Sequence, residues 1–186
     1  LALSLGEFDE ARHAYRDIAL PAARLHHTAQ EVLAIKQALA TVATEAGDFG
    51  GAIEILKDAA EESGRLLGAD HPDTLSSRNN LAIAYQDAGR LNDAIPLHEE
   101  TLKARTQLLG PNHPDTLTSR NNLAAAYRAA GRLNEAIPLH EETLEAQTRI
   151  LGPDHPGTLR SRNNLAVAYE AVDKPFRSEE QPGTST

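Results

Sequence analysis

The sequence feature that most constrains the fold is an internal repeat of 42 residues. Residues 69–110 and 111–152 differ at only 11 of 42 aligned positions, and the first half of the same unit returns over 153–172. A period of this length is typical of arrays in which each supersecondary unit buries its apolar face only against its neighbours. The sequence therefore predicts a stacked array with one continuous core.

Each unit contains two segments with helical periodicity, separated by a turn. In the unit that starts near residue 69, Pro72 suits the first turn of a helix and Gly89 suits its end. Asn92, and Asn134 one unit later, are expected to cap the second helix. The expected helices are 8–20, 22–46, 50–67, 73–88, 92–109, 115–130, 134–151 and 157–172.

These helices are expected to form one array over residues 1–172. The array is degenerate over 1–46, which lacks the GxxHPDT link and the double Asn of later units, and regular over 47–172. After Val172 the pattern stops, and the ending RSEEQPGTST has the composition of a disordered segment. We therefore expect 173–186 to be a disordered tail.

Composition and charge narrow the classes of partner. The formal net charge is −9, from 18 Lys and Arg against 27 Asp and Glu, which argues against nucleic acid and against anionic membranes. No window approaches a membrane-spanning run, and the N-terminus lacks a secretory pattern. The absence of cysteine excludes a disulfide framework and is typical of reducing compartments. A cytoplasmic protein is the expectation.

A helical wheel of residues 74–88 separates two faces. The packing face is predicted to hold the apolar residues Leu75, Leu81, Ala82, Tyr85 and Ala88. The opposite, outward face is predicted to hold Ser76, Asn79, Asn80, Ile83 and Asp87. Within this helix the two most similar units differ only at positions on or beside that outward face: 76/118, 83/125, 86/128 and 87/129. The packing residues are thus the same in both units while the outward residues vary, which favours a recognition surface. The alternative is that the outward residues vary only because nothing constrains them.

The series Asn80-Leu81-Ala82-x-x-Tyr85, followed by Gly89 and Ala94, resembles the tetratricopeptide repeat. The 42-residue unit is most similar to the long repeats of kinesin light chains and of bacterial proteins that share them. The resemblance is strong over 47–172 and weak over 1–46. It implies an all-α, right-handed solenoid of helix-turn-helix repeats. Arginines 78, 120 and 162 depart from the family pattern, because a large apolar residue usually stands there.

In that family the first helix of each unit lines a concave groove, and the Asn before the hallmark Leu hydrogen-bonds an extended peptide. The resemblance carries this role to Asn80, Asn122 and Asn164 but not to Ala38. An Asn amide both donates and accepts, so a ladder of them can satisfy a peptide backbone without reading its side chains. The alternative is that the Asn pairs are ordinary polar residues on a solvent-exposed face without a binding role. The candidate peptide-binding residues are Asn79, Asn80, Asn121, Asn122, Asn163, Asn164, Ser76, Ile83, Asp87, Arg128, Arg160 and Val167.

Arg128 and Arg160 add a preference to the C-terminal half of this groove. The guanidinium of arginine is a planar donor fork that suits a carboxylate. We therefore expect this half to prefer an acidic side chain or a free C-terminal carboxylate, although each arginine can instead pair with Glu170 or point into solvent.

Catalytic and metal sites are not predicted. His98-Glu99-Glu100-Thr101-Leu102 begins like the HExxH zinc motif, but Leu102 stands where the second His ligand must be. Earlier units carry Leu56 and Tyr15 in the His98 slot, which is typical of a packing position. His71, His113 and His155 repeat once per unit, and stacked helices about 8–10 Å apart cannot bring them onto one ion with bonds of about 2 Å. These histidines are instead expected near helix starts.

The sequence thus predicts a non-enzymatic interaction scaffold without cofactor, whose partner is a protein or peptide. A regulatory or sensor segment of a larger signalling NTPase or other multidomain enzyme is the competing hypothesis. A third is self-association through the last helix, 157–172, which no second helix follows.

Overall fold

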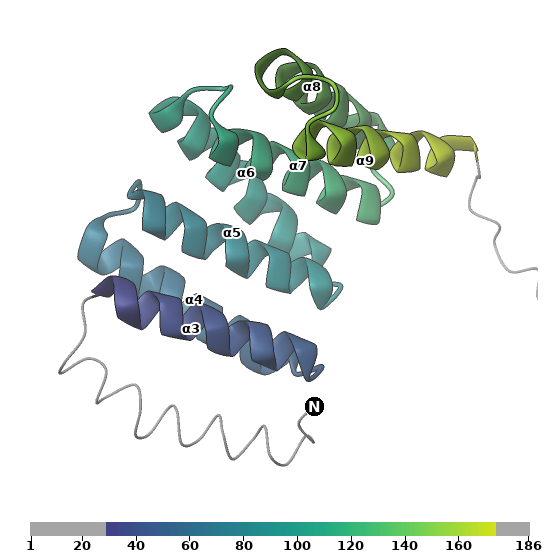
Figure 1. Ribbon diagram of the computed structural model, residues 1–186. Helices are drawn as coiled ribbons and strands as arrows, with labels where there is room; N and C mark the ends of the chain where they lie inside the picture. The colour runs from purple at the N-terminus through teal and green to yellow at the C-terminus, as the bar shows by residue number, and fades with distance from the viewer. Residues whose placement is uncertain (1–28, 174–186) are drawn as a thin grey trace, which may run out of the picture. The chain divides into compact units, whose positions relative to one another are not determined.

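The computed structural model describes residues 29–173, which form seven α-helices (Figure 1). The helices are α3 (Ala29–Glu45), α4 (Phe49–Leu67), α5 (Pro72–Asp87), α6 (Leu91–Leu109), α7 (Pro114–Ala129), α8 (Leu133–Leu151) and α9 (Pro156–Asp173). No strand occurs among these residues, and from 50 onward every predicted helix lies within a residue or so of the observed bounds. The helix predicted over 8–20, the start of that over 22–46 and almost all of the predicted tail lie outside the described residues.

Local chemistry explains where the first helices begin. His71 occupies the N-cap of α5, and its Nδ1 accepts a hydrogen bond from the Asp73 backbone N–H at 3.2 Å. His113 makes the same bond at 3.2 Å and His155 at 3.1 Å, each to the residue two positions later. The prediction that these histidines lie near helix starts is confirmed, and their ring nitrogen satisfies a backbone donor that the helix leaves unpaired.

The second helices begin differently from the prediction. Arg90 and Arg132 occupy the N-cap positions of α6 and α8, with no side-chain capping bond. Asn92 and Asn134 are therefore inside their helices, and the expectation that they cap α6 and α8 is wrong. The sharp turn at Gly89, with φ of +72°, leaves only Arg90 between that glycine and the helix. Arg90 stacks over the Tyr85 ring at 4.7 Å and bonds Asp93, so the turn is fastened by side chains.

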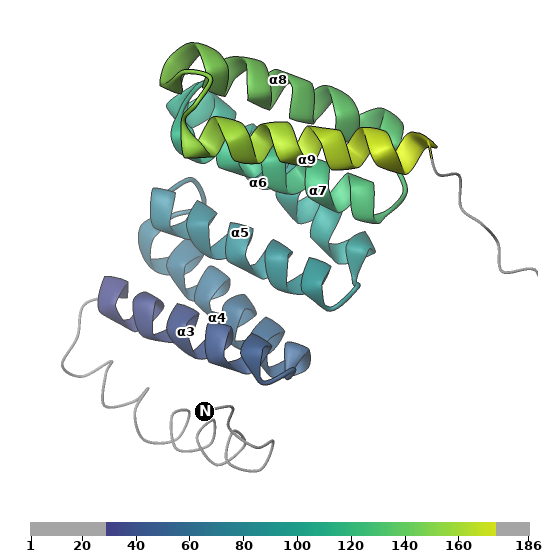
Figure 2. The ribbon, with the colours of Figure 1, turned by 45° about the vertical axis from the view of Figure 1, so that its right-hand side comes forward.

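The chain divides into two compact units, Leu1–Asn122 and Leu123–Thr186. In the first, α4 packs against both α3 and α5, and α5 against α6, while the first helices α3 and α5 also touch directly (Figures 1 and 2). Small residues fill much of this core: Ala43, Ala52 and Ala59 are fully buried. Small side chains such as these let the helices approach one another closely.

In the second unit α8 packs against α9. Ser161 of α9 donates to Gln147 of α8 at 2.7 Å, and the Tyr169 hydroxyl donates to Glu141. Thr158 and Ser161 are buried, so this face of α9 is turned toward α8.

Two of the arginines that depart from the family pattern bond nearby backbone. Arg120 donates to the Pro111 carbonyl at 3.5 Å, and Arg162 donates to the Pro153 carbonyl at 3.4 Å. Both carbonyls belong to the loop before the helix, so each arginine bridges its helix to that loop.

Candidate functional site

The first helix of each repeat has three faces, which are clearest in α5. One face packs on α4 and includes Leu81 and Ala84, which share a buried cluster with Leu56. A second face is formed by positions 75, 78, 82 and 85, of which 78 and 85 line a pocket with residues of α6. The third face carries Asn80, Ile83 and Asp87 and is covered by neither second helix.

This third face of α5 and the facing side of α3 enclose a groove of about 500 Å³ in the first unit. From α5 the groove takes Asn80, Ile83, Ala84 and Asp87, with Leu56 of α4 beneath. From α3 it takes Ala34, Gln37, Ala38, Ala40, Thr41 and Thr44. Small side chains keep the groove open, while amide and hydroxyl groups supply donors and acceptors. Asn80, Ile83 and Asp87 thus meet in one place, as the outward face of the helical wheel predicts.

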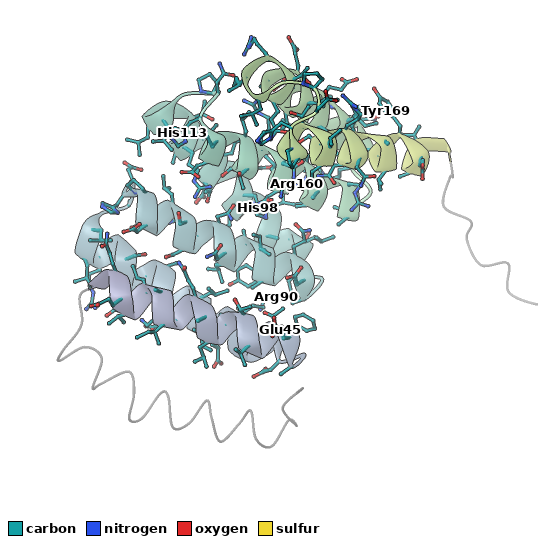
Figure 3. All side chains as sticks on the ribbon, in the orientation of Figure 1. Glu45, Arg90, His98, His113, Arg160 and Tyr169 are labelled. Carbon is teal, nitrogen blue, oxygen red and sulfur yellow. The ribbon has the colours of Figure 1, made fainter. Side chains whose placement is uncertain are left out.

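Asp87 lies near one end of α5, and burial raises the pKa of its carboxyl. Glu45 occupies the equivalent position on α3, 42 residues earlier, and is exposed at the end of that helix (Figure 3). Both first helices of this groove therefore end on an acidic residue, whereas Ala129 and Ala171 occupy this position later.

Asn79 was predicted on the outward face, and this prediction is wrong. Its side chain is buried, and its Oδ1 accepts a hydrogen bond at 3.1 Å from the Nδ2 of Asn122. The second Asn of this repeat thus bonds the first Asn of the repeat before it, and the buried oxygen of Asn79 is satisfied within the protein. One donor of Asn122 is thereby committed to the protein itself.

Ser76 is also engaged within the protein. Its hydroxyl accepts a hydrogen bond at 3.1 Å from Arg105, a buried arginine on α6. Arg105 also donates to Ser119 at 2.9 Å and to the Asp115 carbonyl at 3.2 Å. Burial lowers the pKa of Arg105, and the nearby charge of Asp115 raises it. Ser76 therefore belongs to a hydrogen-bond network that links α5, α6 and α7.

The remaining candidates lie on α7 and α9. Asn121 and Asn164 are half-buried, whereas Asn163, Val167, Arg128 and Arg160 are exposed. Arg160 lies near the start of α9 (Figure 3). Arg128 helps to lower the pKa of His140, behind the larger effect of burial.

The α3 side of the groove was missed by the reasoning on sequence. Gln37, Thr41 and Thr44 stand 42 residues before Asn79, Ile83 and Gln86. The 42-residue offset could have identified these positions. The segment 1–46 lacks the double Asn and the GxxHPDT link, however, so its alignment with the later repeats was not evident.

His98 and His140 are fully buried, as expected of packing positions. Within residues 29–173 no group of three or more His, Asp and Glu is arranged to hold a metal ion. The helices of this part of the chain are also too short or too polar to cross a membrane.

Comparison with known proteins decides the family. The model of the tetratricopeptide repeat matches residues 31–107, 78–147 and 119–175. The chain belongs to the tetratricopeptide repeat family. The expected all-α solenoid of helix-turn-helix repeats is confirmed.

Solved structures of tetratricopeptide repeats agree with this assignment. The nearly identical TPR-like repeats of a candidate kinesin light chain from Podosopora anserina are 30% identical, with a TM-score of 0.71, over 90% of this chain and 80% of that one. A single-substitution variant of those repeats gives the same identity and a TM-score of 0.73. BtubC (BKLC) from P. vanneervenii shares the fold at 22% identity and a TM-score of 0.72, over 90% of this chain and 67% of that one. No curated protein sequence matches the chain.

The resemblance to kinesin-light-chain-type tetratricopeptide repeats is therefore confirmed. Repeats of this family mediate protein–protein interactions, and the fold is typical of non-catalytic scaffolds.

Proposed function

We propose that this chain is a non-enzymatic interaction module that binds an extended peptide segment along its first helices. The observation that carries the proposal is the groove between α3 and α5, with Asn80 on one wall and Gln37 on the other. Amide side chains from both helices of the groove suit a peptide backbone, which needs both donors and acceptors along its length.

Asn80 differs from Asn122 in the way that this function requires. The Asn122 amide donates to Asn79, so part of its capacity is used within the protein. Asn80 faces a helix that carries Gln37 and Ala38 in the double-Asn positions, and its amide lines the groove. Asn80 is therefore the residue on which the first test should act.

The test starts from peptides selected by display against the whole chain. Asn80→Ala should weaken binding by about 1–3 kcal/mol, because peptide backbone groups would be desolvated without partners. Fluorescence anisotropy of a labelled peptide measures the dissociation constant. Asn92→Ala is the matched control, since Asn92 is exposed on α6, away from the groove.

A gain-of-binding variant makes the test sharper. Ala38 lines the groove in the slot that Asn80 fills one repeat later, and it is exposed, so Ala38→Asn should not disturb packing. It should tighten binding by roughly 0.5–1.5 kcal/mol if its amide reaches the peptide. If both Asn80→Ala and Ala38→Asn bind the peptide with the affinity of the parent and melt like it, the α3–α5 groove is not part of the peptide-binding site.

A further inference from the structure

The second face of α9 is exposed, although the same face is covered in α5. Leu159 is 45% exposed, whereas its equivalent Leu75 is 0% exposed. Ala166 is exposed and Tyr169 is 45% exposed, whereas the equivalent Ala82 is fully buried and Tyr85 half-buried. The exposed stripe consists of Leu159, Arg162, Ala166 and Tyr169, with Val172 at its edge.

This stripe has the spacing of a helix-packing seam. Its positions follow one another at intervals of three, four and three residues, which is the spacing that one helix presents to another. In α5 this face is buried or half-buried. The sequence after α9 does not repeat that of a second helix: Asp173 and Pro175 replace Gly131 and Leu133 of the preceding unit. The face therefore has the pattern of a helix-binding surface without a covering helix among the described residues.

We propose that the stripe of α9 binds the same stripe of a second copy of this chain, with the two helices antiparallel and related by a two-fold axis near Leu165 and Ala166. The argument for this occupant is the order of charged and aromatic residues along the stripe. Arg162 precedes the axis, and Tyr169 and Glu170 follow it at similar distances. A two-fold axis thus sets Arg162 of one copy opposite Tyr169 of the other, with Glu170 about 1.5 Å further along.

The other first helices support the pairing of Arg162 with Tyr169. The Tyr85 ring carries the Arg90 guanidinium at 4.7 Å, and the Tyr127 ring carries that of Arg132 at 4.3 Å. In the last repeat a lysine, Lys174, stands at the sequence position that Arg90 and Arg132 occupy in the two repeats before it. An arginine from the second copy would give the third ring the same kind of contact and would also meet the carboxylate of Glu170. A parallel pairing would set Arg162 against Arg162, so the charges favour the antiparallel arrangement.

The proposed interface leaves three of the four peptide-binding candidates of α9 accessible, and only Asn163 lies beside the stripe. Arg160, Asn164 and Val167 lie on a different side of the helix from Leu159, Ala166 and Tyr169. Figure 3 shows Arg160 and Tyr169 toward opposite ends of α9. Dimerisation and peptide binding thus use separate faces, and failure of one does not imply failure of the other.

Sedimentation velocity on the whole chain, over about 1–200 µM, tests the proposal in the range of weak homodimers. We expect a concentration-dependent shift from monomer to dimer mass. Arg162→Glu and Glu170→Arg should each raise the dimer dissociation constant about tenfold or more, because each creates two like-charge pairs across the axis. The double variant Arg162→Glu with Glu170→Arg should dimerise more tightly than either single variant, since the charge pairs are restored with reversed sign, but less tightly than the parent, because a glutamate at position 162 cannot stack on the Tyr169 ring.

Lys103→Glu on α6 and Glu145→Arg on α8 make the same charge changes at exposed positions outside the stripe and should leave the dissociation constant unchanged. Circular dichroism melts check that each variant folds, because Arg162 also bonds the Pro153 carbonyl. A parent that stays monomeric throughout, as it would if another segment or partner covered the stripe, overturns the proposal. The proposal is also overturned if the parent dimerises but neither single variant raises the dissociation constant. It is overturned as well if the double variant dimerises no more tightly than the single variants.

Discussion

At the scale of single residues, the core contains two histidines where an aliphatic side chain would fit. His98 is 0% exposed, and none of its ring nitrogens, nor those of His140, has a hydrogen-bond partner within the described residues. Leu56 fills the same slot one repeat earlier and is buried in an apolar cluster. Burial lowers the pKa of His98 to about 4, because the charged imidazolium would lose its hydration without gaining a counterion.

This histidine predicts a specific dependence of stability on pH. The unfolded chain protonates His98 near its ordinary pKa of about 6.5, whereas the folded chain does so only near 4. Between those values the unfolded state binds more protons, so the free energy of unfolding falls as pH falls, by up to roughly 3 kcal/mol in total. Urea denaturation at pH 7 and pH 5 measures the loss.

His98→Leu separates this effect from the titration of carboxylates in the same range. The variant should be more stable at pH 7 by about 1–2 kcal/mol, since two unpaired buried nitrogens are replaced by an apolar side chain of similar size. It should also lose less stability on going to pH 5. An equal loss in parent and variant would show that His98 does not titrate differently in the two states.

At the scale of helices, Arg105 ties three elements of the first unit together. From α6 its guanidinium reaches Ser76 on α5 and Ser119 on α7, and its own carbonyl accepts a hydrogen bond from Thr116 at 3.3 Å. The equivalent residue on α8, Gln147, bonds Ser161 on α9 at 2.7 Å. A long polar side chain in this slot therefore links the second helix of one repeat to the first helix of the next.

The link predicts unequal effects of two substitutions. Arg105→Ala should destabilise the chain by about 2–4 kcal/mol, because buried hydroxyl and carbonyl acceptors lose their donor and a cavity forms. Arg105→Gln should cost less than half of that, since glutamine already fills the slot on α8. Thermal and urea denaturation give both values. If alanine and glutamine cost the same, neither the volume of the side chain nor its hydrogen bond to Ser119 governs the stability of this site.

How much of this could be read from the sequence depends on how local each signal is. Helix limits followed from near neighbours: the histidine caps, the left-handed glycines and the periodicity of apolar residues. The outward positions of Asn80, Ile83 and Asp87 followed from the wheel. The burial of Asn79 and the reach of Arg105 did not, because both depend on the register between successive repeats. Asn92 failed as a cap because one residue, not three, separates Gly89 from the start of α6.

At the scale of the molecule, one fold is reused while the third face of the first helices changes charge along the chain. The slot at the helix end holds Glu45, then Asp87, then Ala129 and Ala171. On this face an arginine enters only at Arg160 on α9, in the slot of Ser76 and Thr118, while Arg128 lies beside the face near the end of α7, and both arginines are exposed. The first unit therefore offers carboxylates along this face, whereas the second offers guanidinium groups, and each unit should select its own kind of side chain.

This gradation predicts opposite preferences for two sets of peptides. At the α3–α5 groove, a peptide with lysine should bind more tightly than the same peptide with glutamine, since a charge-assisted hydrogen bond is about twice as strong as a neutral one. Asp87→Asn should reduce that preference. On α9 a glutamate or free carboxylate should be preferred over glutamine or an amide, and Arg160→Gln should abolish that preference. Anisotropy titrations of matched peptide pairs at low and high salt measure each preference, and both should shrink as salt screens the charges. If Arg160→Gln left the glutamate preference intact while Asp87→Asn removed the lysine preference, anion selection would have to be assigned to residues other than Arg160.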